Sequence, residues 1–221
     1  MNDTLLELQN ILVNRHTDAT GFFGLWGART VRALDGVSLS LRRGETLGLM
    51  GGSGSGKTTL AETATLRRAP DRGRIFFEGR DVTKAGGGEK DKLQRRLQMI
   101  RQDARESLEM DKPVGKQFRE RMKQYGLPDP DARIARALEL VELPADFADR
   151  MPVQMSGGQQ QRTAIARALA LGPVMVAADE PVSGVDPHLQ RDMLNMLERV
   201  QKQQNIAYLL ISHDRKTVQR L

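Results

Sequence analysis

The sequence lacks several residue types and patterns that would point to other classes of protein. Its 221 residues include no cysteine, which excludes disulfides and thiolate metal sites. Aromatic residues make up only 4%, too few to favour a surface on which nucleic-acid bases stack. No apolar run approaches the roughly 18 residues that a membrane-spanning helix needs. With 39% hydrophobic and 28% charged residues, the composition is that of a folded domain with a substantial core.

Positive charge is in moderate excess, and much of it lies in one stretch. The net charge is +6, and residues 91–123 hold ten Lys and Arg residues against six acids. A basic chain invites a nucleic-acid interpretation, but the shortage of aromatics argues against it, and we expect no nucleic-acid partner. A solvated helical face is the ordinary interpretation of such a stretch. The alternative is proximity to anionic phospholipid headgroups or to a partner surface.

Strand-like and helix-like segments alternate along the chain. This alternation is typical of an α/β protein with a parallel sheet. A loop with three glycines is expected at 14–30, and a long polar helical stretch at 91–148. The predicted strands are 5–13, 31–41, 46–50, 74–77, 174–178 and 207–211, and the predicted helices are 60–66, 160–171 and 190–203.

Residues 51–58 read GGSGSGKT and match the phosphate-loop pattern G-x-x-x-x-G-K-[ST]. A predicted strand precedes them and a predicted helix follows, as the pattern demands. Glycines let backbone N–H groups converge on phosphate oxygens, and the helix N-terminus adds partial positive charge. We expect Lys57 to reach the β- and γ-phosphates, Thr58 to bind Mg²⁺ and Thr59 to contact the α-phosphate region. The loop itself comprises Gly51, Gly52, Ser53, Gly54, Ser55 and Gly56.

A pair of acids ends the predicted strand at 174–178. In phosphate-loop enzymes, such a strand lies beside the loop and its Asp organises Mg²⁺. Asp179 is therefore the predicted metal residue. Glu180 follows one position later, where its carboxylate is predicted to polarise an attacking water.

Residues 155–162 (MSGGQQQR) resemble the LSGGQ-x-QR signature of the nucleotide-binding domains of ABC transporters. The 23 residues from Ser156 to Asp179 also fit that family. Locally, Ser156 is a good helix N-cap, and Gly157 and Gly158 leave backbone N–H groups open to an anion. The resemblance implies that Ser156, Gly157, Gly158 and Gln159 contact the γ-phosphate of an ATP held by a second subunit. Each site would then be shared across a head-to-tail dimer.

Three shorter segments resemble further motifs of the same family. Residues 98–103 (QMIRQD) resemble the Q-loop, in which Gln102 is implied to sense Mg²⁺ and the attacking water. Residues 183–186 (SGVD) resemble the D-loop, which ends at Asp186. Residues 211–214 (ISHD) resemble the H-loop, in which His213 is implied to contact the γ-phosphate. Arg101 and Ala104 depart from the Phe and Pro found in many relatives.

The residue that stacks on adenine is left open. In the family it is an aromatic in the loop before the second strand. Trp26 lies seven residues before Ala33, a spacing that suits this role, and Phe22 and Phe23 are the alternatives.

The resemblance covers essentially the whole chain and implies a P-loop NTPase of the α/β class. It implies a mainly parallel RecA-like core, an antiparallel β subdomain and a helical signature subdomain, all within one domain at 1–221. The helical subdomain would span about 91–158, with the core and β subdomain at about 1–90 and 159–221. Relatives typically continue past the H-loop with two more strands and a helix, so these strands are expected to be missing here. Reduced stability or a compensating partner is the expected consequence.

The sequence of residues 178–183 (ADEPVS), together with that of residues 97–103 (LQMIRQD), is most similar to the dipeptide, oligopeptide and nickel importer ATPases. This implies catalytic roles for Glu180, His213, Gln102 and Lys57, and Mg²⁺ held with Thr58, Gln102 and Asp179. The implied partners are a second nucleotide-binding domain, transmembrane permease subunits and, indirectly, a solute-binding protein. The implied location is the cytoplasmic face of the inner membrane.

Three other functions stay open at this point. One is the ATPase of an exporter of the lipoprotein or antimicrobial-peptide type. Another is a soluble ABC ATPase that acts on ribosomes or nucleic acid. The third is an inactive partner in a heterodimer, against which the presence of Glu180 and His213 argues.

Overall fold

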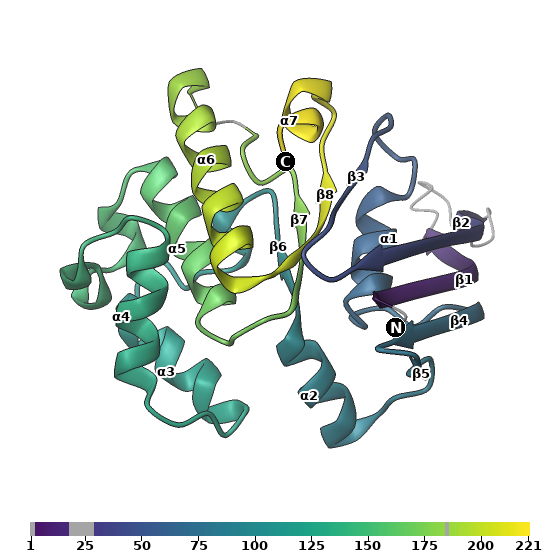
Figure 1. Cartoon of the computed structure of the whole chain (residues 1–221), viewed down its shortest axis with the longest axis horizontal. Coiled ribbons are helices and arrows are strands. Elements are labelled where there is room, and N and C mark those ends of the chain that lie inside the picture. The colour runs from purple at the N-terminus through teal and green to yellow at the C-terminus, as the bar shows by residue number, and fades with distance from the viewer. Residues whose placement is uncertain (1–2, 18–28, 184–185) are drawn as a thin grey trace, which may run out of the picture.

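The chain folds into two sheets with helices around them. A computed structural model describes residues 3–17, 29–183 and 186–221. Figure 1 shows the parallel sheet in the middle, the antiparallel sheet on one side of it and helices α3 to α6 on the other. The strands are β1 (Thr4–Thr17), β2 (Arg29–Arg42), β3 (Thr46–Leu49), β4 (Arg72–Phe77), β5 (Arg80–Asp81), β6 (Leu97–Ile100), β7 (Met175–Asp179) and β8 (Ala207–Ile211). The α-helices are α1 (Lys57–Ala64), α2 (Gly87–Arg96), α3 (Val114–Gln124), α4 (Pro130–Leu140), α5 (Gly157–Leu169), α6 (Pro187–Gln204) and α7 (Arg215–Arg220), and the 3₁₀-helices are η1 (Ala104–Glu106), η2 (Ala145–Asp149) and η3 (Pro152–Gln154).

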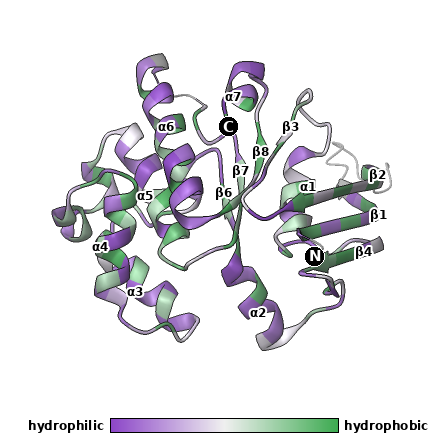
Figure 2. Ribbon diagram, in the orientation of Figure 1, coloured by the Kyte–Doolittle hydropathy of each residue, from purple (hydrophilic) through white to green (hydrophobic). Residues whose placement is uncertain are grey.

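The antiparallel sheet has the strand order β2-β1-β4-β5. Its central strand β1 places Leu8 opposite Leu39 of β2 and Ile75 of β4. Leu6 and Leu8 are buried, whereas Glu7 between them is half-buried. This alternation turns one face of the sheet to the core and leaves the other face polar. Figure 2 shows the same alternation as green and purple stripes along these strands.

The parallel sheet has the strand order β3-β8-β7-β6 and is covered on both faces. Val176 and Tyr208 belong to the apolar cluster that the helices complete, whereas Ala177 and Leu209 belong to the cluster on the other face. Strands buried on both faces cannot alternate apolar and polar residues, which explains the unbroken apolar runs at 175–178 in β7 and 207–211 in β8.

Helix α1 joins the two sheets. It contacts strands of the parallel sheet and also β1 and β2, and Leu60, Ala61 and Ala64 on it are buried. The turn before it ends at Gly56, whose φ is +91°. A Cβ at that position would lie 2.2 Å from the carbonyl oxygen of Ala33, so only glycine fits there. The phosphate loop is thereby fixed against β2 at one side.

The structure corrects two of the predicted elements. β1 runs on to Thr17 and β2 begins at Arg29, so strand occupies part of the predicted loop at 14–30. The predicted helical stretch at 91–148 contains the strand β6, in which Leu97 pairs with Met175 of β7. A four-residue strand between charged residues carries no periodic signal of its own, because its burial comes from its neighbour in the sheet. The limits of a helical subdomain at 91–158 stay a prediction.

Within the described ranges, no helix is both long enough and apolar enough to cross a bilayer.

Candidate functional site

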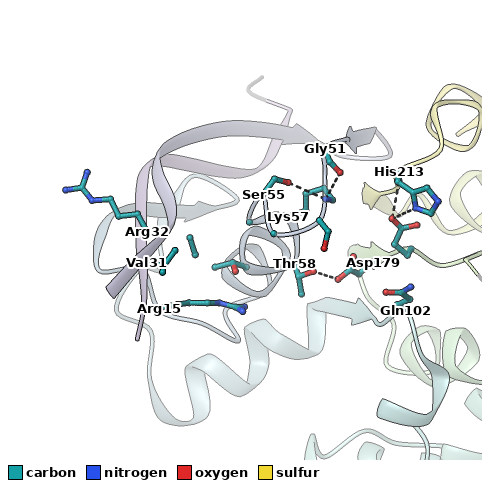
Figure 3. A pocket seen from close by; sticks show the side chains of 16 residues that line it. Arg15, Val31, Arg32, Gly51, Ser55, Lys57, Thr58, Gln102, Asp179 and His213 are labelled. Carbon is teal, nitrogen blue, oxygen red and sulfur yellow. Dashed lines mark hydrogen bonds and ion pairs between the residues drawn. The ribbon is translucent and has the colours of Figure 1, made fainter. Parts of the chain in front are cut away.

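A cavity of about 560 Å³ opens where the phosphate loop meets the carboxyl ends of β7 and β8. Ligands of parallel α/β sheets bind at these strand ends, and the volume suits a small molecule. Figure 3 shows the labelled side chains around the cavity. The structure therefore brings together most of the residues predicted for the nucleotide site. These are Gly51, Ser53, Gly54, Ser55, Gly56, Lys57, Thr58, Thr59, Gln102, Asp179, Glu180 and His213.

Lys57 lies folded into the phosphate loop. Its Nζ donates hydrogen bonds to the carbonyl oxygens of Gly51 and Gly52, each at 2.7 Å, and to Ser55 Oγ at 3.3 Å. The first turn of α1, which begins at Lys57, carries no acidic residue. The ammonium group and the positive end of the helix dipole are thus available to an anion at the same place.

Thr58 and Asp179 form the oxygen pair to which the sequence assigns Mg²⁺. Thr58 Oγ1 donates a hydrogen bond of 2.7 Å to Asp179 Oδ2 across the cavity wall. Within the described residues, no cluster of three or more His, Cys, Asp or Glu side chains could hold a metal by itself. Mg²⁺ usually takes one or two protein oxygens and completes its shell with phosphate oxygens and water. The pair fits such an ion.

Burial is the main influence on the Asp179 carboxyl. It raises the pKa of Asp179 above its ordinary value, because a partly buried carboxylate loses hydration. The hydrogen bond from Thr58 works against this rise, whereas the negative charge of Glu180 adds to it. A cation bound beside Asp179 would offset both the lost hydration and the charge of Glu180, and would favour the ionised form of Asp179.

Glu180 is held in an uncommon backbone conformation. Its φ is +51°, a region that residues other than glycine rarely adopt. Its N–H donates to the carbonyl oxygen of Ile211 at 3.0 Å, which ties it to the end of β8. Its Oε1 accepts the backbone N–H of His213 at 3.0 Å and lies 2.8 Å from Nδ1 of the same histidine. Backbone strain of this kind is typical of functional positions.

Glu180 and His213 differ in their access to solvent. The Glu180 side chain is 13% exposed and the His213 side chain 72% exposed. The carboxylate therefore lies in the wall of the cavity, while the imidazole lies at its mouth. With a proton on Nδ1, the imidazole donates to the carboxylate and leaves Nε2 free to act on a ligand.

Gln102 lies between two cavities. Its Nε2 donates to Ser183 Oγ at 3.3 Å, and the residue lines the phosphate-loop cavity. It also lines a second cavity of about 570 Å³, which includes Ser156, Gly157, Gly158 and Asp186. The predicted Q-loop glutamine thus lines both the phosphate-loop cavity and the cavity that includes the signature residues.

The signature residues form a separate site. Ser156 is the N-cap of α5, with Oγ accepting the Gln159 N–H at 3.4 Å and its own N–H donating to Gln159 Oε1 at 3.0 Å. This capping box confirms Ser156 as the predicted N-cap, and the helix begins at Gly157, three residues before the predicted start at 160. The residues predicted for the signature do not line the cavity around Lys57. Within the described part of one chain, the signature and the phosphate loop therefore face different cavities.

Asp186 of the predicted D-loop caps the next helix along the chain. Its Oδ1 accepts the N–H of His188 at 2.9 Å, at the start of α6.

The residues at the far end of the phosphate-loop cavity escaped the sequence analysis. Arg15 of β1 and Val31 and Arg32 of β2 line that end, away from Asp179 and His213. Val31 is a large apolar residue that is 52% exposed. The sequence did offer a signal for this end of the cavity, because Val31 is an apolar residue within the otherwise polar run at 29–32. Trp26, Phe22 and Phe23, predicted as adenine contacts, lie outside the described residues.

Known proteins are similar to this chain in sequence. A family profile described as "ABC transporter" matches residues 34–183. The oligopeptide transport ATP-binding protein OppD of Mycobacterium tuberculosis is 42% identical over 193 residues, which cover 86% of this chain and 32% of that protein. The nickel import ATP-binding protein NikE of Pseudomonas putida is 41% identical over 192 residues, covering 86% and 70%. For AppF, an oligopeptide transport ATP-binding protein of Bacillus subtilis, the identity is 38%, covering 86% and 59%. The chain thus spans less than two thirds of the length of two of these three relatives.

Solved structures share the fold. A dimeric ATP-binding cassette in a post-hydrolysis state with ADP and Pi has a TM-score of 0.82 at 24% identity, covering 98% of this chain and 91% of that one. The structure of cbiO1 from Clostridium perfringens, part of an ABC transporter complex, has a TM-score of 0.79 at 25% identity, covering 96% and 80%. These matches confirm the predicted fold class.

The sequence and structural similarities agree with one another. The family profile spans the phosphate loop, Gln102, the signature and Asp179. The relative from Pseudomonas putida is matched over more than two thirds of its length. The chain therefore belongs to the ABC transporter family, and its sequence relatives there are ATP-binding proteins of oligopeptide and nickel transport.

Proposed function

We propose that this protein hydrolyses ATP to power an import system for peptides, nickel or similar small solutes. One observation carries the chemical part of the proposal. The Thr58–Asp179 pair and the Glu180–His213 pair lie around a single cavity that also holds Lys57. The names of the relatives support the type of transport.

The phosphate loop would hold the triphosphate. The phosphate loop and Lys57 line the cavity, and hydrogen bonds from backbone N–H groups and from the Lys57 ammonium suit phosphate oxygens. Mg²⁺, when bound beside Thr58 and Asp179, would neutralise charge on the phosphate oxygens. Lys57 would exchange its contacts with the loop carbonyls for contacts with phosphate.

Glu180 is the proposed base for the attacking water. Its carboxylate is fixed by two contacts with His213 and lies in the cavity wall, so little reorganisation would be needed to orient a water. His213 would keep Glu180 in place and direct Nε2 to the transferring phosphoryl group. Gln102 would act together with Glu180 and His213, from the side of the second cavity, which it also lines.

A second copy of the cassette is the proposed partner at the signature. Ser156, Gly157 and Gly158 line the second cavity, apart from Lys57, and the N-terminus of α5 there suits an anion. A head-to-tail dimer would bring this helix end to the ATP of the other subunit, so each site would need both chains.

Transmembrane permease subunits are the proposed partners, and ATP hydrolysis by this chain would drive their change of conformation. The helical block at 91–158 would dock on them at the cytoplasmic face of the membrane, and Gln102 at its start would report the state of the nucleotide. The permeases and an external solute-binding protein would determine the solute.

Mixing two inactive variants tests the shared site. Lys57→Ala disables the phosphate loop and Ser156→Arg disables the signature, so each variant alone should show no ATP turnover. A mixture should regain part of the activity, because one of the two sites in a mixed dimer has both parts intact. If the mixture stays inactive while both variants still fold and bind each other, the shared site is wrong.

A second experiment tests the transport role. The full chain, expressed with candidate permease subunits from the same genome, should co-purify with them, and its ATPase activity should rise on assembly in a membrane. Stimulation by RNA or DNA in place of a permease would favour a soluble ABC ATPase instead.

A further inference from the structure

The Glu62 carboxylate on α1 faces three arginines that come from separate parts of the chain. Arg68, which follows α1, donates from Nε to Glu62 Oε2 at 2.9 Å. Arg15 of β1 places Nη2 3.6 Å from the same oxygen, and Arg101 after β6 places Nη2 3.6 Å from Glu62 Oε1. The Glu62 side chain is 14% exposed, whereas those of the arginines are 37–45% exposed. One shielded carboxylate thus holds three solvent-accessible cations together.

Glu62 lies close to the phosphate-loop cavity. It is on the same face of α1 as Thr58, four positions further along the helix. Thr58 pairs with Asp179 in the wall of that cavity. The buried residues Leu60 and Ala64 anchor α1 in the core. The carboxylate is therefore a fixed point for the arginines around it.

Arg15 lines the phosphate-loop cavity at the end where Val31 lies. In Figure 3 its side chain reaches toward Thr58, whereas that of Arg32 points the other way. With its phosphates at Lys57, a nucleotide lying along the cavity brings its base to this end. A guanidinium group is planar and stacks on aromatic faces. Arg15 therefore suits the face of the base, as long as it is held in the cavity.

Arg101 acts at the other end of the cavity through its neighbour Gln102. Arg101 Nη1 lies 2.9 Å from Glu106 Oε2, so its guanidinium group is held between η1 and Glu62 of α1. Its carbonyl oxygen accepts a hydrogen bond from Gln161 Nε2 at 3.5 Å. Gln102, the next residue, lines the cavity together with the proposed base. The contacts of Arg101 therefore decide where the Gln102 side chain begins.

We propose that Glu62 is a positioning residue of the ATP site. It holds Arg15 at the base end and, through Arg101, sets Gln102 at the phosphate end. This role rests on the proposed function, because it requires that the cavity binds ATP. Without the carboxylate, three like charges would repel one another. Arg15 would turn to solvent, and Arg101 would be left with Glu106.

Nucleotide binding tests the base end. Glu62→Gln removes the charge and keeps both the size of the side chain and an oxygen for Arg68. It should weaken binding of a non-hydrolysable ATP analogue with Mg²⁺ about fivefold, and Arg15→Gln should do the same, because each removes the stacked cation. Inorganic tripolyphosphate with Mg²⁺, which has no base, should bind both variants and the parent alike. Equal weakening of the two ligands in Glu62→Gln would contradict the proposal.

Glu89→Gln is the matched control. Glu89 lies on α2 and pairs with Arg80 at 2.6 Å, and neither residue lines the phosphate-loop cavity. The control therefore loses the same charge and the same kind of ion pair as Glu62→Gln. It should bind both ligands and turn over ATP as the parent does.

Turnover tests the phosphate end. At saturating ATP, Glu62→Gln and Arg101→Gln should lower kcat about tenfold, because a displaced Gln102 no longer presents its amide in the productive geometry. Arg15→Gln should act on KM instead. Glu62→Asp keeps the charge on a shorter side chain and should recover part of both losses. A merely structural role of Glu62 would lower the melting temperature and leave kcat at saturating ATP unchanged, and that result would overturn the proposal.

Double variants show whether the arginines act through Glu62. Adding Arg15→Gln to Glu62→Gln should weaken ATP binding no further, because both changes remove one contact. Adding Arg101→Gln to Glu62→Gln should likewise lower kcat no further. Losses that multiply in either pair would mean that the residues act independently, and the proposal would be wrong.

The outcomes separate this role from the proposed function. If the parent hydrolyses ATP while Glu62→Gln matches Glu89→Gln in KM and kcat, the role of Glu62 is wrong and the ATPase stands. If the parent binds the ATP analogue without hydrolysing ATP, the ATPase is wrong, and the comparison with tripolyphosphate still decides the Arg15 contact. Should Glu62→Gln fail to fold, Glu62→Asp and Arg15→Gln give the same readouts, and parent-like values in both would overturn the proposal.

Discussion

The Nδ1 atom of His213 lies 2.8 Å from Oε1 of Glu180, and the same carboxylate oxygen accepts the backbone N–H of His213. The two residues are 33 positions apart and follow neighbouring strands, β7 and β8, which run parallel and side by side. One oxygen of the proposed base is thus occupied by its neighbour, and the other stays available for water.

This relationship predicts the behaviour of Glu180→Gln. The amide keeps an oxygen that can accept the His213 N–H, so the variant should fold and bind ATP as the parent does. ATP turnover should fall about a hundredfold or more, because the general base is lost. Steady-state turnover and nucleotide binding measured on the same preparation check the split. His188→Gln, at an exposed histidine on α6, should leave both unchanged. Undiminished turnover in Glu180→Gln would remove Glu180 from the mechanism.

Asp179→Asn should separate stability from activity. A raised pKa means that the folded chain binds this proton more tightly than the unfolded chain does. The contribution of Asp179 to the free energy of unfolding therefore falls as pH rises, from the ordinary carboxyl pKa of about 4 up through the raised value. At pH 7 the ionised carboxylate lowers stability, and the amide removes this effect while keeping an acceptor for Thr58.

The expected result is a higher melting temperature for Asp179→Asn at pH 7, together with loss of Mg²⁺-dependent turnover. The difference in melting temperature between Asp179→Asn and the parent should shrink as the pH falls below the raised pKa of Asp179. The parent's carboxyl is then neutral, as the variant's amide is at every pH. Asp91→Asn, at an exposed site on α2, serves as the control and should change neither property. A lower melting temperature at pH 7 would mean that the Asp179 carboxylate stabilises the fold.

Gly56→Ala should destabilise the fold through the phosphate loop. Alanine at a φ of +91° is strained, and its Cβ would lie 2.2 Å from the Ala33 carbonyl oxygen. We expect the free energy of unfolding to fall by about 1–3 kcal/mol. Gly52→Ala in the same loop meets no atom within 4 Å and should change it by less than about 0.5 kcal/mol. Urea unfolding of the two variants checks the contrast, and equal stability would show that the loop can move away from β2.

Val31→Ser tests the far end of the phosphate-loop cavity. Val31 is half-exposed there, so a nucleotide base lying against it would bury apolar area. Losing that contact should weaken ATP binding by about 1 kcal/mol, or roughly fivefold. Binding of inorganic tripolyphosphate, which has no base, should not change. Val153→Ser, at a valine outside the cavity that is 64% exposed, is the control. If ATP and tripolyphosphate weaken together, Val31 acts on the phosphate loop and not on the base.

The sequence alone determined the parts of this protein whose chemistry lies in consecutive residues. Three such features can be predicted from the sequence, because backbone N–H groups and neighbouring side chains act there at fixed spacing. They are the phosphate loop, the acidic pair Asp179 and Glu180, and the cap at Ser156. The two buried strands β7 and β8 were readable as well, since burial on both faces leaves an unbroken apolar sequence.

Only the tertiary structure decided which residues far apart in the sequence pair or come into contact. β6 became a strand through pairing with β7, and Thr58 met Asp179 across 121 positions. Arg67, after α1, and Arg167, on α5, line one cavity although they are far apart in the sequence, and no local pattern marks them as neighbours. The reason is physical: sequence spacing fixes contacts within one turn or strand, whereas the strand order and helix packing decide which distant charges share one space.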